Sequence, residues 1–288
     1  MTQTAGRDLY DRVAAEASGV VIRRYSSSFG LASRLLERGI RRHVTNIYAL
    51  VRVADEVVDG VAASAGLPAA QVAERLDALE REVEDALVTG YSTNLVVHAF
   101  AGTARATGFG AELTRPFFAS MRADLTATEH TPESFREYVY GSAEVVGLMC
   151  LAAFLVGHEP RDRARMETGA RALGAAFQKV NFLRDLATDF GELGRSYFPG
   201  VRVETFDESQ KTALVDDLDA DLALARAVLP ELPWGSRRAV RAAHGLFAEL
   251  SRRVRATPAA RLATTRVRVP DPVKLRIVAA AAADRSLS

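Results

Sequence analysis

The spacing of apolar residues follows the period of an α-helix along almost the whole chain, and the alternation typical of a half-buried strand is nearly absent. Gly, Pro and polar residues break this pattern at intervals. Thr131 is expected to cap a helix that has Pro132 at its first position, and Gly157 to Pro160 is expected to end the most apolar helix. The pattern therefore predicts helices at residues 8–24, 42–59, 69–89, 93–107, 111–127, 133–157, 162–188, 208–229, 236–256 and 271–285.

The sequence contains no internal repeat, heptad array, low-complexity tract or shift in composition that would mark a domain boundary. We expect residues 1–288 to form a single all-α domain. About six residues at the N-terminus and about five at the C-terminus are expected to be disordered, as chain ends often are.

Composition limits the classes of protein that are compatible with this chain. Hydrophobic residues are 48% and charged residues 25% of the 288 residues, which is ordinary for a folded protein with a substantial core. Lys and Arg number 37 against 36 Asp and Glu, so the formal net charge is +1. This balance argues against a generally basic nucleic-acid-binding protein and against an acidic disordered tail. Cys150 is the single cysteine, which excludes an internal disulfide framework.

The N-terminal residues do not read as a signal peptide, because charged residues interrupt every apolar run in the first twenty. The longest uncharged apolar run, Val145 to Gly157, is too short to span a bilayer and is expected to be a buried helix. We therefore expect a cytoplasmic protein without a membrane-spanning segment.

Two apolar segments carry acidic residues at four-residue spacing. Asp55 and Asp59 share one helix face, and Asn181, Asp185 and Asp189 share another. Like charges at this spacing cost a helix about 0.2–0.5 kcal/mol per pair, and acids that line an interior need a counter-charge. A bound cation supplies one, and carboxylate and amide oxygens favour Mg²⁺ or Mn²⁺ over Zn²⁺.

An arginine precedes each acidic row. Mg²⁺ commonly binds through carboxylates together with substrate phosphates, and Arg52 and Arg184 have paired N–H donors for the same phosphates. The alternative is that the acids lie on a solvated face and pair with nearby arginines. The apolar flanks of both segments, such as Val57 and Leu186, argue against that alternative.

Several other kinds of site are excluded by their missing motifs. No Glu-x-x-His pair is present, which a di-iron carboxylate bundle requires. The sequence also lacks a P-loop, a dinucleotide fingerprint and a G-x-S-x-G nucleophile elbow.

Four linked segments resemble those of the squalene/phytoene synthases, which join two prenyl diphosphates head to head. The resemblance extends from about residue 20 to about residue 278, and the sequence is most similar to those of bacterial phytoene synthases. The segments are Tyr25-Ser26-Ser27-Ser28-Phe29, the stretch from Tyr48 to Asp59, the stretch from Tyr138 to Gly147, and the stretch from Gln178 to Asp189 followed by Arg195-Ser196-Tyr197-Phe198-Pro199.

The resemblance implies an isoprenoid-synthase helical bundle with a central active-site cavity, and it implies a role for particular residues. The implied metal ligands are Asp55, Asp59, Asn181, Asp185 and Asp189. Contact with diphosphates, or orientation of the metal site, falls to Ser26, Ser28, Tyr48, Arg52, Gln178 and Arg184, and Tyr197 is a further substrate-binding position. The residues implied to line the prenyl channel and the reaction centre are Phe29, Tyr138, Ala143 and Gly147. The catalytic set implied is Arg52, Asp55, Asp59, Tyr138, Asp185 and Asp189.

The sequence departs from the family pattern at two positions. Tyr25 stands where a histidine is common, and Glu56 stands where a second aspartate is common; Glu56 keeps a carboxylate, so we expect metal binding to survive. Gly141 and Gly147 lie inside a helical pattern, where each costs about 1 kcal/mol relative to alanine. Either a prenyl chain or another helix passing close by would explain them.

The activity implied is condensation of two geranylgeranyl diphosphates, through a cyclopropyl diphosphate, to phytoene with release of two diphosphates, as in carotenoid biosynthesis. Mg²⁺ is expected as cofactor, with Mn²⁺ as a substitute, and NADPH is not expected. Two alternatives remain open: a C30 synthase that acts on two farnesyl diphosphates to give dehydrosqualene, presqualene diphosphate or squalene, and a non-catalytic helical protein that binds prenyl diphosphates.

Basic residues are concentrated near the C-terminus, where eleven lie between Ser236 and Arg276 against Glu249 and Asp271. One interpretation is a solvated helix face. The other is attraction to an anionic membrane, which is worth about 1 kcal/mol for each basic residue near the surface. We expect peripheral membrane association and no nucleic-acid partner, and we leave the oligomeric state open.

Overall fold

A computed structural model describes residues 3–26, 28–191, 196–262 and 264–283. Within these ranges, the side chains of residues 3, 4, 28, 187–191 and 203 are not described. The described part of the chain is all-α, as predicted, and contains no strand beyond an isolated bridge between Glu129 and Ser196.

The helices follow the predicted order with a few additions. They are α1 (Gln3–Tyr25), α2 (Ser28–Ser33), α3 (Arg38–Val58), α4 (Val61–Ser64), α5 (Ala69–Thr89), α6 (Leu95–Thr107), α7 (Ala111–Thr126), α8 (Pro132–Val139), η1 (Tyr140–Glu144), α9 (Val145–Phe154), α10 (Arg163–Gly191), η2 (Val203–Thr205), α11 (Glu208–Val228), η3 (Leu229–Glu231), α12 (Trp234–Ala256), α13 (Ala259–Leu262) and α14 (Asp271–Ala283).

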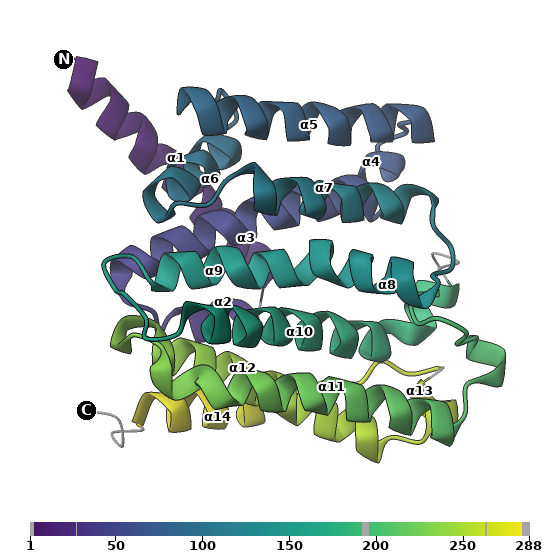
Figure 1. The fold of residues 1–288 in the computed structure, drawn as a ribbon. Helices are drawn as coiled ribbons and strands as arrows, with labels where there is room; N and C mark the ends of the chain where they lie inside the picture. The colour runs from purple at the N-terminus through teal and green to yellow at the C-terminus, as the bar shows by residue number, and fades with distance from the viewer. Residues whose placement is uncertain (1–2, 27, 192–195, 263, 284–288) are drawn as a thin grey trace.

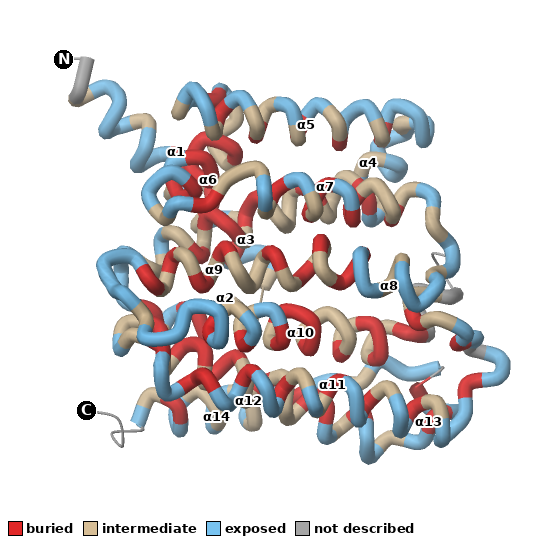
Figure 2. Tube along the Cα trace, viewed as in Figure 1, coloured by how far each residue is buried: buried red, intermediate tan, exposed pale blue. Residues whose placement is uncertain are grey.

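The long helices lie roughly side by side in a bundle (Figure 1). Helix α5 lies at one edge, followed by α6 and α7, then by α8 and α9, then by α10, and α11, α12 and α14 form the opposite edge. Buried residues lie along the inward faces of these helices (Figure 2). One apolar cluster joins α3, α5, α6, α7 and α9, and a second joins α8, α10, α11 and α12. Helices α9 and α10 therefore lie at the centre of the molecule.

Capping residues set several helix ends. Thr131 caps α8 and forms a reciprocal capping box with Ser134, so the predicted start of this helix is confirmed. Asp207 and Gln210 form the same arrangement at the start of α11. The unpredicted helices α2, α4 and α13 are four to six residues long, too short for a hydrophobic period to show in the sequence.

The helix predicted at 133–157 is interrupted. Its backbone changes from α to π geometry over η1 and returns to α in α9. A π turn contains an extra residue compared with an α turn, and such segments are frequent at functional sites. The sequence pattern does not reveal the change, because α9 is apolar on all of its faces and a one-residue shift of the helix face leaves no trace in such a segment.

Glycines let the central helices approach one another closely. A Cβ atom at Gly141 would overlap the Pro116 carbonyl of α7, and one at Gly147 would overlap the Ala170 carbonyl of α10. Gly174 of α10 has the same relation to the Ala143 carbonyl. Helix packing therefore explains Gly141 and Gly147 and favours one of the two explanations considered from the sequence.

The continuous helical stretch Pro132–Phe154 is long and apolar enough to cross a membrane by length and composition. It is the one such stretch among the described residues, and 56% of its apolar window is buried inside the protein. Its position between α7 and α10 is that of a core helix.

Candidate active site

One stripe of helix α3 carries the polar residues predicted for the site. The helix buries apolar side chains such as Ile47 and Leu50, and the residues at four- and three-residue spacing from Tyr48 form a separate row. That row contains Tyr48, Arg52 and Asp55. The amphipathic pattern of α3 thus places an aromatic hydroxyl, a guanidinium and a carboxylate in line.

The N-terminal end of this row contacts the first predicted segment. The rings of Phe29 and Tyr48 stack with their centroids 5.6 Å apart, and Ser26 hydrogen-bonds to the Tyr48 hydroxyl. Burial raises the pKa of Tyr48. The Arg52 guanidinium lies over the Tyr25 ring, 4.8 Å from its centroid. Tyr25, which replaces the common histidine, thereby supports the arginine through a cation–π contact.

The carboxylates of α3 are crowded. Arg52 forms an ion pair with Glu56 and lies 3.9 Å from Asp55, and Asp59 is the exposed residue that ends the helix. Burial, followed by the neighbouring charge of Asp59, raises the pKa of Asp55 to about 8. A carboxylate with this pKa holds its proton at neutral pH unless a cation binds beside it.

Helix α10 presents the second polar row. Gln178, Asn181 and Asp185 lie at three- and four-residue spacing on one face. The Asn181 side-chain oxygen is buried and has no hydrogen-bond partner. Arg184 and Arg266 both pair with Asp185; its Oδ1 lies 2.7 Å from the Arg266 Nε. The second row thus combines a neutralised carboxylate with an amide oxygen that is free to bind a ligand.

The predicted metal site is incomplete in the described part of the chain. No three Asp, Glu, His or Cys side chains converge there closely enough to hold a metal ion. The side chain of Asp189 lies outside the described residues, and so does that of Ser28, whose backbone begins α2. The donors that are described, carboxylates and the orphaned Asn181 oxygen, are of the hard oxygen type that Mg²⁺ takes. Arginines supply part of the counter-charge that the two acidic rows were predicted to need.

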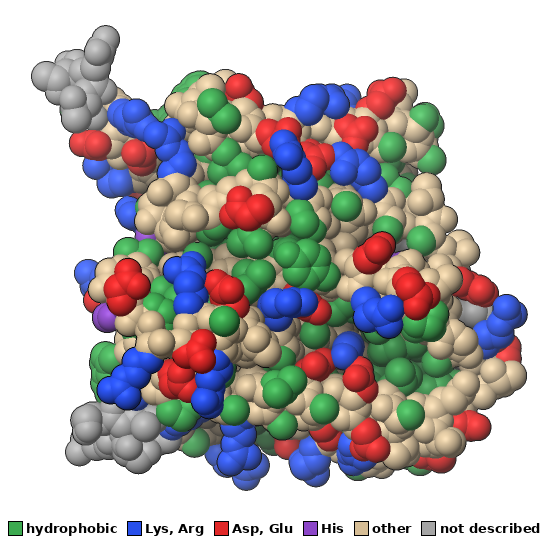
Figure 3. Space-filling model, in the orientation of Figure 1, with side chains coloured by type: hydrophobic (Ala, Val, Ile, Leu, Met, Phe, Trp, Pro, Cys, Tyr) green, Lys and Arg blue, Asp and Glu red, His purple; other side chains and the backbone are tan. Residues whose placement is uncertain are grey.

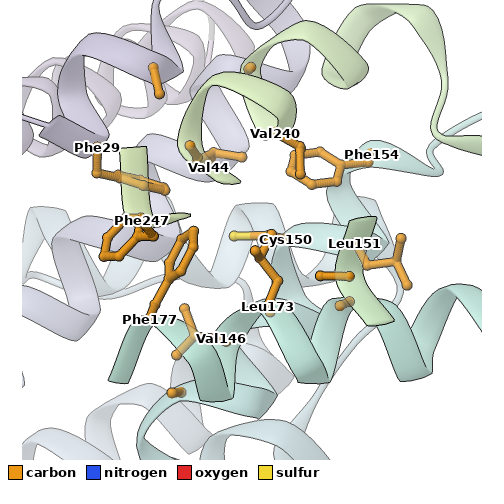
Figure 4. Close-up of a pocket in the computed structure, with 18 of the residues that line it drawn as sticks. Phe29, Val44, Val146, Cys150, Leu151, Phe154, Leu173, Phe177, Val240 and Phe247 are labelled. Carbon is orange, nitrogen blue, oxygen red and sulfur yellow. The ribbon is translucent and has the colours of Figure 1, made fainter. Parts of the chain in front are cut away.

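An apolar cavity of about 300 Å³ begins between these two rows. Tyr48 of α3 and Gln178 and Asn181 of α10 line one end, where the polar groups lie. The rest is walled almost entirely by apolar side chains of α2, α9, α10, α11, η3 and α12, as Figure 4 shows for part of it. The rings of Phe177 and Phe247 stack there with their centroids 3.7 Å apart. Of the predicted residues, those that line the cavity are Phe29, Tyr48, Ala143, Gly147, Gln178 and Asn181.

Tyr138 and Tyr197 lie elsewhere, in an aromatic cluster that does not line this cavity. Both hydroxyls donate to the buried carboxylate of Asp124, and the Tyr197 ring stacks on Phe182 with their centroids 4.0 Å apart. The charge of Asp124 contributes to the raised pKa of Asp55, so the cluster adjoins the acidic row of α3. Asp124 was not among the predicted site residues, although its place one helical turn after the apolar Met121, on the face of α7 that the structure buries, could have indicated it.

A second, polar cavity of about 550 Å³ adjoins Asp185. Arg184 of α10 and Arg266, Arg268 and Lys274 of the C-terminal segment line it, together with Asp271. Part of the basic C-terminal concentration is therefore brought to the end of the acidic row on α10. Guanidinium groups in such a place suit a diphosphate, because they offer paired donors.

Comparison with known sequences identifies the family. Residues 22–272 match the sequence model of squalene/phytoene synthases, which is most of the chain. The chain belongs to the squalene/phytoene synthase family.

Two relatives of this chain within the family are named phytoene synthases. A 15-cis-phytoene synthase of a Paracoccus species is 29% identical over 245 residues, which is 80% of this chain and 78% of the relative. Phytoene synthase 1 of Zea mays is 30% identical over 201 residues, which is 69% of this chain. The match spans 46% of that plant relative, or slightly less than half of its length.

Solved structures agree on the fold. A dehydrosqualene synthase crystallised with a ligand superposes with a TM-score of 0.79 at 22% identity, covering 94% of this chain and 96% of that one. The squalene synthase HpnC of Alicyclobacillus acidocaldarius gives a TM-score of 0.73 at 22% identity, covering 86% and 95%. The predicted isoprenoid-synthase helical fold is thus confirmed.

Proposed function

We propose that this protein is a phytoene synthase, which joins two geranylgeranyl diphosphates into prephytoene diphosphate and then phytoene. The observation that carries this proposal is the apolar cavity that begins between two polar helix rows. A prenyl diphosphate has the matching form, with a charged head and a long hydrocarbon tail. Membership of the family and the names of the Paracoccus and Zea mays relatives support the same reaction.

The length of the cavity supports a C20 substrate. Its lining on α10 extends from Asn181 to Met166, fifteen steps along the helix that span about 22 Å at 1.5 Å per residue. An extended hydrocarbon advances about 1.25 Å per bond, so the main chain of a C20 prenyl group reaches about 19 Å and that of a C15 group about 14 Å. The longer chain fills the cavity, whereas the shorter one leaves its far end empty.

The charged head binds at the mouth of the cavity, which is the polar end lined by Tyr48, Gln178 and Asn181. Arg52 and Arg184 bind diphosphate oxygens and move off their carboxylate partners to do so. Tyr48 and Gln178 orient the head at the mouth of the cavity. Asp55, Asp59, Asn181, Asp185 and Asp189 would hold Mg²⁺. When bound, Mg²⁺ neutralises the charge that develops on the departing diphosphate.

The rest of the cavity protects the cation that forms when the C–O bond breaks. Its apolar walls exclude water, which would otherwise trap the cation as an alcohol. Phe29 at the mouth offers a ring face to the positive charge, an interaction worth about 0.5–2 kcal/mol. Proton loss from the rearranged cation completes the reaction without an external reductant, so NADPH is not required.

A product assay tests the proposal. Purified protein is incubated with Mg²⁺ and either geranylgeranyl diphosphate or farnesyl diphosphate, with and without NADPH, and the hydrocarbon is identified by mass spectrometry. We expect a C40 product with a central triene from the C20 substrate, independent of NADPH. A C30 product from the C15 substrate alone would assign the protein to the C30 branch, and no product in the presence of detergent would support a binding protein.

We also propose a cytoplasmic protein that associates peripherally with membranes, where its hydrophobic substrate dissolves. The net basic character of residues 236–276 supports this. Many of these charges are balanced locally, because Arg252 and Arg253 pair with Glu249 and Arg255 pairs with two aspartates of α11. Side chains of both signs also alternate over the face shown in Figure 3. We therefore expect weak, salt-sensitive binding.

A further inference from the structure

On the α10 wall of the cavity, one level is lined by smaller side chains than the levels on either side of it. On α10 the lining residues recur on a single face, and at the level of Gly169 and Ala170 that face carries no side chain larger than a methyl group. Leu173 lies one turn toward the mouth, and Met166 lies one turn toward the closed end. This level is therefore where the α10 wall leaves most room for a chain to pass.

The position of Ala170 corresponds to the difference between two substrates. Eleven residues separate it from Asn181, which places it about 16 Å along the cavity. A C15 chain of about 14 Å ends before this level, and a C20 chain of about 19 Å passes it. The fourth isoprene unit would thus be the part of the substrate that lies beside Ala170.

The backbone at this level has no freedom to move away. The Ala170 carbonyl packs against Gly147 of α9 so closely that a Cβ there would overlap it. On the neighbouring position, a Cβ at Gly169 would overlap the Val228 side chain of α11. A larger side chain at residue 170 must therefore project into the cavity, because α10 cannot shift to relieve it.

The closed end is formed by a small apolar cluster. Met166 is 1% exposed and packs with Leu151, Leu155, Leu229, Leu232 and Val240. Met166 is the one unbranched, flexible side chain in this cluster. Its position, about 22 Å from Asn181, is just past the reach of a C20 chain.

We propose that Ala170 and Met166 set the chain length of the substrate: Ala170 admits the fourth isoprene unit and Met166 excludes a fifth. This inference rests on the proposed function only in that the cavity must hold a prenyl chain. The two residues are specificity determinants and have no part in the chemical step.

The test compares Ala170→Leu with Ala164→Leu, the same substitution at an exposed position of α10. The affinities of both proteins and the wild type for geranylgeranyl and farnesyl thiolodiphosphates are measured by calorimetry with Mg²⁺, since the C–S bond resists ionisation. We expect Ala170→Leu to weaken C20 binding by at least about 10-fold and C15 binding by less than about 3-fold, the scale of discrimination for a few methylene groups. Ala164→Leu should leave both affinities unchanged.

A second variant, Met166→Ala, tests the closed end by opening space there. We expect it to bind a C25 thiolodiphosphate at least about 10-fold more tightly than the wild type does, with C20 binding within about 3-fold. This variant enlarges the cavity, so it stays informative if Ala170→Leu fails to fold, which its melting temperature would show.

The outcomes separate the two proposals. If the wild type makes no hydrocarbon but the affinity ratio shifts as expected, the chain-length assignment stands and the proposed reaction does not. If the wild type makes phytoene and neither variant changes the C20-to-C15 or C25-to-C20 ratio, the reaction stands and the assignment is wrong. If no thiolodiphosphate binds to the wild type, both are overturned.

Discussion

The phenolic oxygen of Tyr138 lies 2.9 and 2.8 Å from the two carboxylate oxygens of Asp124, so the hydroxyl donates its hydrogen to a buried anion. Tyr197 donates to the same carboxylate at 3.1 Å. Burial, and then the Asp124 charge, raise the pKa of Tyr138 well above its usual value. Tyr138 therefore remains protonated at any pH at which the protein would work, and its phenolate is not available as a base.

Removal of the Tyr138 hydroxyl should reduce stability through Asp124. We expect Tyr138→Phe to lower the free energy of unfolding by about 1–3 kcal/mol, because the buried carboxylate loses a donor. Asp124→Asn in the same chain should recover part of this loss, and a double-mutant cycle by urea denaturation measures the coupling. Tyr91→Phe, at an exposed tyrosine, is the control. Additive effects of the two substitutions would contradict the interpretation.

The two acidic rows should respond in opposite directions to loss of a charge. At pH 9 and in the absence of Mg²⁺, where Asp55 is ionised, Asp55→Asn should raise the melting temperature, because it removes repulsion between Asp55 and Asp59. Asp185→Asn should lower it modestly, because Asp185 pairs with Arg184 and Arg266. Both variants should reduce turnover by at least about 10²-fold, the scale of one lost charge-stabilising group. Thermal melts without Mg²⁺, followed by product assays, check this; near-normal turnover would mean that the acids are structural.

The raised pKa of Asp55, about 8, predicts how metal binding depends on pH. At pH 7 the carboxyl group is mostly protonated in the metal-free protein, so Mg²⁺ binding should release a proton. The affinity for Mg²⁺ should rise with pH up to about 8 and then level off. Calorimetry in two buffers of different ionisation enthalpy measures the protons released, and Asp55→Asn should release fewer. Release that is equal in the two proteins would mean that another group titrates.

The same shift predicts the pH dependence of stability. The pKa of Asp55 is higher in the folded protein than in the unfolded chain, where it is about 3.9. Between these two values the unfolded chain holds fewer protons, so this group makes the metal-free protein less stable as the pH rises from about 4 to about 8. Above pH 8 its contribution is constant. Urea denaturation across this range should show a shallower decline for Asp55→Asn than for the wild type.

Two glycine substitutions should change the free energy of unfolding in opposite directions. Gly147→Ala should destabilise by about 1–3 kcal/mol, because the added Cβ overlaps the Ala170 carbonyl and forces α9 and α10 apart. Gly102→Ala is the matched control in helix α6, where a Cβ meets no atom within 4 Å. That substitution should stabilise by about 0.5–1 kcal/mol through helix propensity. Equal effects in urea denaturation would mean that the approach of α9 to α10 has no energetic weight.

Membrane binding should depend on salt. We expect part of the protein to pellet with anionic liposomes at low ionic strength and to be released at high ionic strength, since surface attraction is screened within about 10 Å at 0.1 M salt. Neutral liposomes are the control. Pelleting that is unchanged between low and high salt would count against electrostatic docking.

The sequence by itself determined the long helices and the identity of the polar rows. Apolar periodicity over ten to thirty residues is a strong local signal, so the predicted range 69–89 coincides with α5. Spacing along one helix likewise placed Tyr48, Arg52 and Asp55 in a single row, because these relations depend only on the helix period. The family resemblance rested on the same short-range spacings.

Only the tertiary structure decided which of these residues share a cavity. Phe29 and Ala143 line it, whereas Tyr138 faces Asp124, a residue that no motif had singled out. The Arg266 ion pair with Asp185 joins positions that are eighty-one residues apart, and no periodic pattern encodes such a contact. Contacts of this kind depend on how helices cross and how closely glycines let them approach, and both are properties of the packed molecule.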